Sequence, residues 1–173
     1  LPENAPNNFL LNIQKDQENN LAKYLDSYGI KNAKIYPMVK GRIHSINGRK
    51  LNALDYESVS TRRLLRREIN LSYGKEIPKH NKIVVGSELD PSKSEVSVEK
   101  GFAKSFGIRV NDKLGFDIAG EIVHAKVTSI RSLKWESMEV NFFMFLSNIA
   151  LKDKPQSLIT SFYLKPVNSL GEK

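Results

Sequence analysis

The sequence predicts an α+β domain in which strands predominate. Near both chain ends, apolar and polar residues alternate as they do in half-buried strands. Shorter stretches repeat apolar residues at the three- and four-residue spacing of amphipathic helices. Turn-forming pairs such as Asn47-Gly48 separate these stretches. With 40% hydrophobic and 27% charged residues, the composition is that of a folded globular protein.

The first third of the chain predicts a strand, a helix and a long strand. Residues 9–14 alternate as a strand, and Asp16 follows at a position suited to a helix N-cap. The helical spacing continues to Gly29, a residue type that often ends a helix in the left-handed conformation. Ala33–Ile46 then has the composition of a long strand, and Asn47-Gly48 predicts a tight hairpin after it.

The middle of the chain predicts two short helices. Ser60 or Thr61 is placed to cap a helix over Arg62–Asn70. Ser97 is placed to cap a second helix over Val98–Phe106. A polar stretch with one short β-branched run separates them.

The remaining part predicts further strands. Residues 114–118 and 122–131 form an antiparallel pair across a turn at Ala119-Gly120. Such strands build a small barrel or a curled sheet. Residues 141–146 and 158–164 are apolar and aromatic, and they predict two more strands.

The chain is strongly basic, with a net charge of +8 and a pI near 9.6. Such a charge suits an anionic partner, either nucleic acid or a membrane surface. The 27 Lys and Arg residues are spread along the chain, with one tight group whose predicted role is contact with an anionic surface: Arg62, Arg63, Arg66 and Arg67. No apolar run approaches the roughly 20 residues that a membrane-spanning helix needs.

Few side chains are arranged for catalysis or metal binding. The lack of cysteine excludes thiol chemistry, disulfides and cysteine metal sites. Ser97 and Lys100 match the Ser-x-x-Lys pattern of penicillin-recognising enzymes, without the companion motifs of those enzymes. Asp112 and Asp117 form a weak acid–base candidate, and the three histidines are too scattered to predict a metal site. The sequence predicts no cofactor. A hydrolase with an atypical site and a basic nucleic-acid-binding module are the alternatives to a non-catalytic domain.

An aromatic stretch near the end of the chain is the best candidate for contact with a substrate or partner. Phe143 and Phe145 are predicted to share one face of a strand, with Phe142 on the other. The residues just before that strand lie in a polar context, which favours their exposure. The predicted contact surface consists of Trp135, Met138, Asn141 and Phe142.

Several stretches, taken in order and spacing, resemble one family. They are Asn8-Phe-Leu-Leu-Asn-Ile13, Tyr36-Pro-Met-Val-Lys-Gly-Arg42 with Ile46-Asn-Gly48, Arg67-Glu-Ile-Asn-Leu71, Val96-Ser-Val-Glu-Lys-Gly101, Gly115-Phe-Asp-Ile-Ala-Gly120 with Val127-Thr-Ser-Ile-Arg131, Trp135-Glu-Ser-Met138 with Asn141-Phe-Phe143, and Thr160-Ser-Phe162. Together they resemble the large periplasmic domain of YbbP-type permeases, in the FtsX/MacB-like ABC transporter superfamily. Two departures are Lys40, where the family pattern has Arg, and Val140, where it has Pro.

The resemblance implies a MacB-like periplasmic core domain with two lobes. The two chain ends would form a porter-like α/β lobe, with boundaries at residues 1–47 and 138–173. Residues 48–137 would form an inserted, mostly β, sabre-like lobe. A change of composition near Gly48 and the aromatic strands that follow Trp135 agree with this division.

The function that the resemblance implies is mechanical. Such a domain has no catalytic residues and lies on the periplasmic side of the bacterial inner membrane, as part of a multi-pass membrane protein. The parent protein would pair with a cytoplasmic ABC ATPase, whose ATP-driven closure would move the membrane helices and, through them, the periplasmic lobes. The resemblance also implies a hydrophobic or lipid-like substrate and a periplasmic esterase or lysophospholipase partner, and it implies no nucleic acid.

Overall fold

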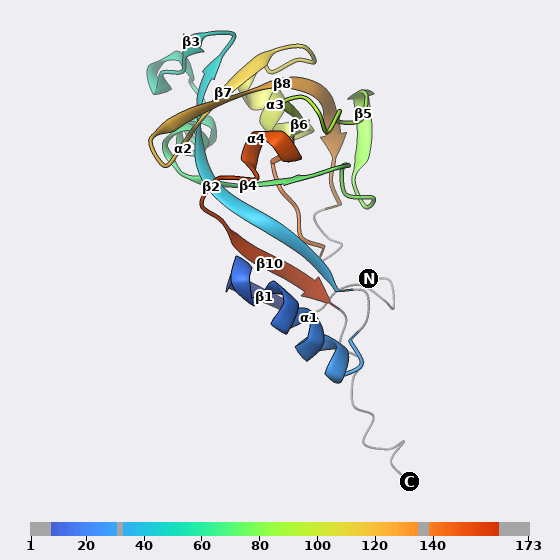
Figure 1. Ribbon diagram of the computed structural model, residues 1–173. Coiled ribbons are helices and arrows are strands. Elements are labelled where there is room, and N and C mark those ends of the chain that lie inside the picture. The colour runs from blue at the N-terminus through green and yellow to red at the C-terminus, as the bar shows by residue number, and fades with distance from the viewer. Residues whose placement is uncertain (1–7, 31–32, 135–138, 163–173) are drawn as a thin grey trace.

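The computed structural model describes residues 8–30, 33–134 and 139–162. Within these residues the fold is mixed and dominated by strands (Figure 1). The strands are β1 (Asn8–Gln14), β2 (Lys34–Ile46), β3 (Arg49–Lys50), β4 (Ile69–Gly74), β5 (Lys82–Gly86), β6 (Glu95–Glu99), β7 (Lys113–Ile118), β8 (Glu121–Ser132), β9 (Met144–Ser147) and β10 (Ser157–Phe162). The helices are α1 (Glu18–Ser27), α2 (Val59–Arg66), α3 (Lys100–Phe106) and α4 (Asn148–Leu151), with short 3-10 turns η1 (Lys15–Gln17) and η2 (Ala53–Asp55).

Six of the strands close into a barrel. Around it the order is β2-β4-β9-β6-β8-β7, and β7 pairs back with β2. The β4–β9 and β6–β8 pairs are parallel, and the other four are antiparallel. Strand β5 pairs with residues 129–132 of β8, beyond the residues of β8 that pair with β7, and forms an edge. Of the two predicted alternatives, a small barrel or a curled sheet, the structure has the barrel, with a strand order that is far from the order of the sequence.

A smaller antiparallel sheet holds the two described chain ends together. Strand β10 lies between β1 and β2, and Asn8 pairs with Phe162. Helix α1 lies beside this sheet, with Leu25 buried (Figure 1). We call β1, β10 and the first part of β2 the chain-end sheet.

Strand β2 belongs to both the chain-end sheet and the barrel. Residues 34–38 pair with β10, whereas residues 39–46 pair with β4 and β7. A strand of 13 residues is about 40 Å long, at roughly 3.3 Å per residue. Figure 1 shows β2 running without a break from one sheet into the other. One continuous strand therefore joins the chain ends to the barrel.

The barrel does not match the predicted description of an inserted lobe. Strand β9 lies inside the segment 138–173, yet it is a barrel strand between β4 and β6. The second part of β2 lies inside 1–47 and is a barrel strand as well. Both segments predicted for the chain-end lobe thus supply strands to the barrel, because long-range pairing and not local composition decides which strands are neighbours.

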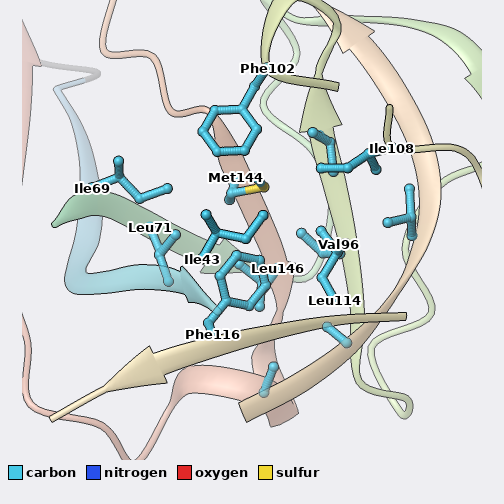
Figure 2. Close-up of a cluster of buried hydrophobic side chains, with 14 of the residues drawn as sticks. Ile43, Ile69, Leu71, Val96, Phe102, Ile108, Leu114, Phe116, Met144 and Leu146 are labelled. Carbon is cyan, nitrogen blue, oxygen red and sulfur yellow. The ribbon is translucent and has the colours of Figure 1, made fainter. Parts of the chain in front are cut away.

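The barrel is filled by apolar side chains from all six strands (Figure 2). Leu71, Val96, Leu114, Phe116 and Met144 have essentially no exposed surface. Helix α3 adds the rings of Phe102 and Phe106, which stack on each other with centroids 4.7 Å apart. A second cluster lies outside the barrel, towards the chain-end sheet, and consists of Met38, Ile77, Leu89, Val140, Phe142 and Phe145.

Two predicted helix boundaries are wrong. Helix α2 is capped by Ser58, whose hydroxyl accepts from the Thr61 N–H, and it ends at Arg66. The expected continuation to Asn70 fails because Ile69 is buried in the barrel as the first residue of β4.

The second helix begins later than predicted. Ser97 lies within β6, and α3 is capped by the Glu99 carboxylate, which accepts from the N–H groups of Gly101 at 2.8 Å and Phe102 at 2.7 Å. Near the start of the chain, Asp16 lies within η1, and α1 begins after Gln17 without a side-chain cap.

The predicted hairpin turns are confirmed. Asn47 and Gly48 both have positive φ, at 51° and 81°, as two-residue turns of the preferred twist require. Ala119 and Gly120 do the same between β7 and β8, at 51° and 85°. These turns fix the registers of β2 with β3 and of β7 with β8.

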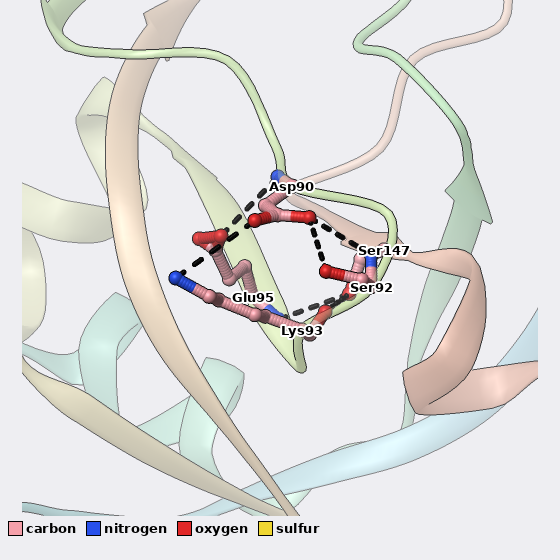
Figure 3. Close-up of polar contacts among 5 residues, drawn as sticks. All are labelled: Asp90, Ser92, Lys93, Glu95 and Ser147. Carbon is pink, nitrogen blue, oxygen red and sulfur yellow. Dashed lines mark hydrogen bonds and ion pairs between the residues drawn. The ribbon is translucent and has the colours of Figure 1, made fainter.

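A polar turn joins the start of β6 to the end of β9 (Figure 3). The Asp90 carboxylate accepts from the N–H and the hydroxyl of Ser92, at 2.9 and 2.6 Å. These bonds, helped by Lys93, hold the pKa of Asp90 below its usual value. The Glu95 N–H donates to the Ser147 hydroxyl at 3.0 Å, and that hydroxyl donates to the Lys93 carbonyl. The contacts align two neighbouring strands that lie far apart in the sequence.

Tyr36, on β2, makes the stability of the fold depend on pH in the alkaline range. Its ring packs edge-on against Phe142, with centroids 5.8 Å apart. Burial raises the pKa of Tyr36 from 10.0 to about 12, and the Glu139 carboxylate acts in the same direction. Because the folded pKa is the higher one, the neutral phenol contributes stability fully below pH 10.0, and this contribution is lost as the pH rises towards 12.

We expect ultraviolet titration of the native protein and of Tyr36→Phe to differ by one tyrosine that ionises near pH 12. Circular dichroism at each pH would verify that the fold persists. If the tyrosine that is absent from the Tyr36→Phe titration ionised with a midpoint near pH 10, the Tyr36 hydroxyl would not be desolvated.

Candidate functional site

A cavity of about 490 Å³ lies where α2 gives way to β4, opposite the segment that enters β9. It brings Arg67 together with Asn141 and Phe142, predicted site residues that lie far from Arg67 in the sequence. We call it the Arg67–Asn141 cavity. The residues that line it are Arg67, Glu68, Ile69, Asn70, Asn141, Phe142 and Phe143.

The wall on the α2 side is formed by the short link into β4. Arg67 ends the helix with extended backbone angles, and its N–H donates to the Arg63 carbonyl at 3.2 Å. Ile69 then turns inward and is buried. Because Ile69 anchors the link, Arg67 and Glu68 remain exposed beside the cavity.

The opposite wall is formed by residues 139–143. Phe142 is buried in the second cluster together with Phe145, whereas Phe143 packs against Phe102 at 5.4 Å. The prediction that Phe142 and Phe145 occupy opposite faces is therefore wrong. Strand alternation does not apply to Phe142 because β9 begins only at Met144.

Arg131, on β8, holds the backbone of Phe142 and Phe143 in this wall by hydrogen bonds. Its guanidinium is fully buried and donates to the carbonyls of Ser97 at 2.8 Å, Phe143 at 3.3 Å and, by a short bond, Phe142. Burial lowers the pKa of Arg131 to about 10, and the nearby Glu99 carboxylate opposes the shift. The group thus remains a cation at neutral pH, held by backbone oxygens.

His80 and Asn81, which precede β5, extend this hydrogen-bond network. The Nε of Arg131 donates to the side-chain oxygen of Asn81 at 3.0 Å, and the Asn81 amide lies 3.5 Å from the Asn141 side-chain oxygen. The Nε2 of His80 donates to the Val140 carbonyl at 3.0 Å. No local pattern indicates a role for Asn81 or His80, because their partners lie 50 to 60 residues further along the chain.

The four clustered arginines do not line one cavity. The guanidinium of Arg62 turns back and donates to the carbonyls of Tyr56 and Glu57, both at 2.8 Å. Arg63 is exposed, Arg66 lines a different cavity, and Arg67 lines the Arg67–Asn141 cavity. Their contact with an anionic surface stays a prediction. Trp135 and Met138 lie outside the described residues.

The candidate catalytic residues are engaged in structural contacts. Ser97 has no exposed surface and accepts from the Ser129 hydroxyl at 2.6 Å. Asp112 accepts from the Arg109 N–H and from the Asn47 amide, and Asp117 accepts from the Gly120 N–H. Across residues 8–30, 33–134 and 139–162, no three His, Cys, Asp or Glu side chains gather as a possible metal site.

Comparison with known proteins confirms the resemblance. The chain is 36% identical over 162 residues to YbbP of Escherichia coli strain K12, described as an uncharacterised ABC transporter permease. The match covers 94% of this chain. The chain is homologous to a segment of a YbbP-type ABC transporter permease. It spans only 19% of the length of YbbP.

Two other comparisons, with family models and with solved structures, do not bear on the relationship to YbbP. No protein-family model matches the chain. The crystal structure of a domain assigned to a permease protein of Porphyromonas gingivalis is 13% identical, with a TM-score of 0.48, and the likeness covers 86% of this chain and 63% of that one. In the part of the chain that the structure describes, no helix has the length and apolar character needed to cross a bilayer.

Proposed function

We propose that this chain is the non-catalytic periplasmic domain of a YbbP-type permease, and that it transmits ATP-driven movement from the inner membrane to a substrate or partner. The observation that carries the proposal is the shared strand β2. Because β2 pairs first with β10 and then with β4 and β7, a displacement of the chain ends moves the barrel with them. The pairing of Asn8 with Phe162 places both described ends at the same end of β2.

The proposed contact surface lies between the chain-end sheet and the barrel. The Arg67–Asn141 cavity offers one cation, one carboxylate, amide groups and aromatic surface, which suits binding better than bond cleavage. We propose that Asn141 and Phe142, with Trp135 and Met138, contact a hydrophobic or lipid-like substrate or a periplasmic esterase or lysophospholipase partner. The exposed arginines of the α2 region would face an anionic surface.

Cysteine labelling of the parent permease, assembled with its ATPase, tests the location. The segment has no cysteine, so Arg63→Cys places one exposed thiol on α2 in a cysteine-free parent background. We expect a membrane-impermeant maleimide to label this thiol in spheroplasts with an intact inner membrane. Val96→Cys, fully buried in the barrel, is the matched control and is expected to react only after unfolding. Labelling of Arg63→Cys only after lysis would overturn the periplasmic location.

The same thiol tests transmission. An environment-sensitive fluorophore on Arg63→Cys is expected to change its emission when the ATPase is trapped with ATP and vanadate, compared with ADP. A variant ATPase that binds ATP without closing should give no change. Identical emission in the trapped and ADP states would overturn the transmission role.

A further inference from the structure

A second cavity, of about 710 Å³, lies at the end of β2 that is far from the chain-end sheet. We call it the far-end cavity. Arg42 comes from β2, Lys50 from β3 and Arg66 from the last turn of α2, and all three side chains are exposed along its wall. Three separate elements therefore direct cations to one place.

The local backbone is shaped around this cavity. The register of β2 against β7 shifts between Ile43 and Ser45, which leaves His44 as the extra residue of a bulge. Bulges redirect side chains and are common beside binding sites. The chain then folds back over the cavity, because the Leu51 N–H donates to the His44 carbonyl at 2.9 Å.

The charges of the far-end cavity are not balanced. The side chains of Arg42, Lys50 and Arg66 form no ion pair or hydrogen bond with any residue that the structure describes, in contrast to the side chains of Lys34, Lys93 and Lys154. The one carboxylate in the wall is Asp117, which accepts from the Gly120 N–H. Three cations facing one carboxylate favour an oxyanion, since guanidinium groups bind phosphate and carboxylate by paired hydrogen bonds.

Apolar side chains make up the floor. Ile43 and Leu51 are buried, and Leu65 is half-buried below the cationic rim. A simple inorganic anion would leave this floor unused. We propose that the far-end cavity binds a small amphiphilic anion, with a phosphate or carboxylate group on Arg42, Lys50 and Arg66 and an apolar portion over Leu51 and Leu65. This site lies outside the Arg67–Asn141 cavity and is independent of the transmission role.

Titration of the 173-residue chain with three probes tests the ligand class. The probes are hexyl phosphate, inorganic phosphate and 1-hexanol, followed by amide chemical shifts. We expect hexyl phosphate to bind at least tenfold more tightly than inorganic phosphate, since burial of two methylene groups already accounts for a factor of about ten. Hexanol should bind more weakly than hexyl phosphate by a similar factor. Equal affinity of hexyl phosphate and either other probe would overturn the proposal.

Two variants of α2 test the site. Arg63 and Arg66 are exposed and one turn apart, but only Arg66 lines the far-end cavity. We expect Arg66→Gln to weaken hexyl phosphate binding at least tenfold and Arg63→Gln to change it less than twofold. Lys50→Gln, on β3, should repeat the loss seen with Arg66→Gln. Equal losses in Arg63→Gln and Arg66→Gln would show general attraction to a basic surface and would overturn the site.

Discussion

Replacement of Arg131 by Met is expected to lower the free energy of unfolding by about 3–5 kcal/mol. Two effects oppose each other. Methionine removes the cost of burying a guanidinium, but it leaves the carbonyls of Ser97 and Phe142 and the side-chain oxygen of Asn81 without this donor. The Phe143 carbonyl keeps the N–H of Glu99 as a partner. Each buried acceptor that loses its partner costs about 1–3 kcal/mol, so the loss outweighs the relief.

Urea denaturation of Arg131→Met against the native protein measures this effect. Lys126→Met is the matched control, because Lys126 lies exposed on the same strand and should change stability by less than about 0.5 kcal/mol. A second expected result is broadening of the amide signals of residues 141–143 in Arg131→Met. Stability within about 1 kcal/mol of the native protein would show that water replaces the guanidinium.

Phe116→Ala is the second substitution with a large expected effect, also about 3–5 kcal/mol. Phe116 has no exposed surface and lies on β7 inside the barrel, among side chains from β2 and β4 (Figure 2). A closed barrel cannot collapse around the missing ring, because its strands are held by hydrogen bonds on both sides. The loss therefore includes a cavity as well as the lost burial.

Thermal and urea unfolding of Phe116→Ala give the measurement. Leu54→Ala provides the control, since the Leu54 side chain is 87% exposed on η2 and should contribute little. If both variants lost the same amount, the apolar filling of the barrel would not be what stabilises it.

The sequence predicts local structure well where a short motif is sufficient. Asn47-Gly48 specifies its turn because Asn and Gly are the residues that best tolerate positive φ at two successive positions. At Ala119-Gly120 only the glycine is of this type, and the alternating strands on either side indicate the turn. The sequence predicts Ser97 as the cap of α3 because serine is a favoured N-cap, yet in the structure Ser97 is a buried residue of β6. Glu99 assumes the capping role two residues later, which only the burial of β6 explains.

The candidate site was only partly predictable. Asn141, Phe142 and Arg67 were identified, and the fold brings them to one cavity. Arg131 lay in a stretch that resembles the permease family, but its role depends on carbonyls contributed by β6 and the entry to β9. Such contacts are long-range, so no pattern of neighbours along the chain indicates them. For the same reason, the sequence predicts a small barrel or a curled sheet but does not decide between them, nor does it indicate the order of the barrel strands.

The position of β9 determines when this chain can fold during synthesis. Because β9 fills the gap between β4 and β6, and β10 fills the gap between β1 and β2, both sheets stay open until β9 and β10 have been made. Once β6 has been made, a growing chain therefore exposes unpaired edges of β1, β2, β4 and β6 and an apolar interior until β9 and β10 follow. Parallel pairs that join distant segments also form slowly. Because of this strand order, the nascent chain must be protected from aggregation until its last strands have paired.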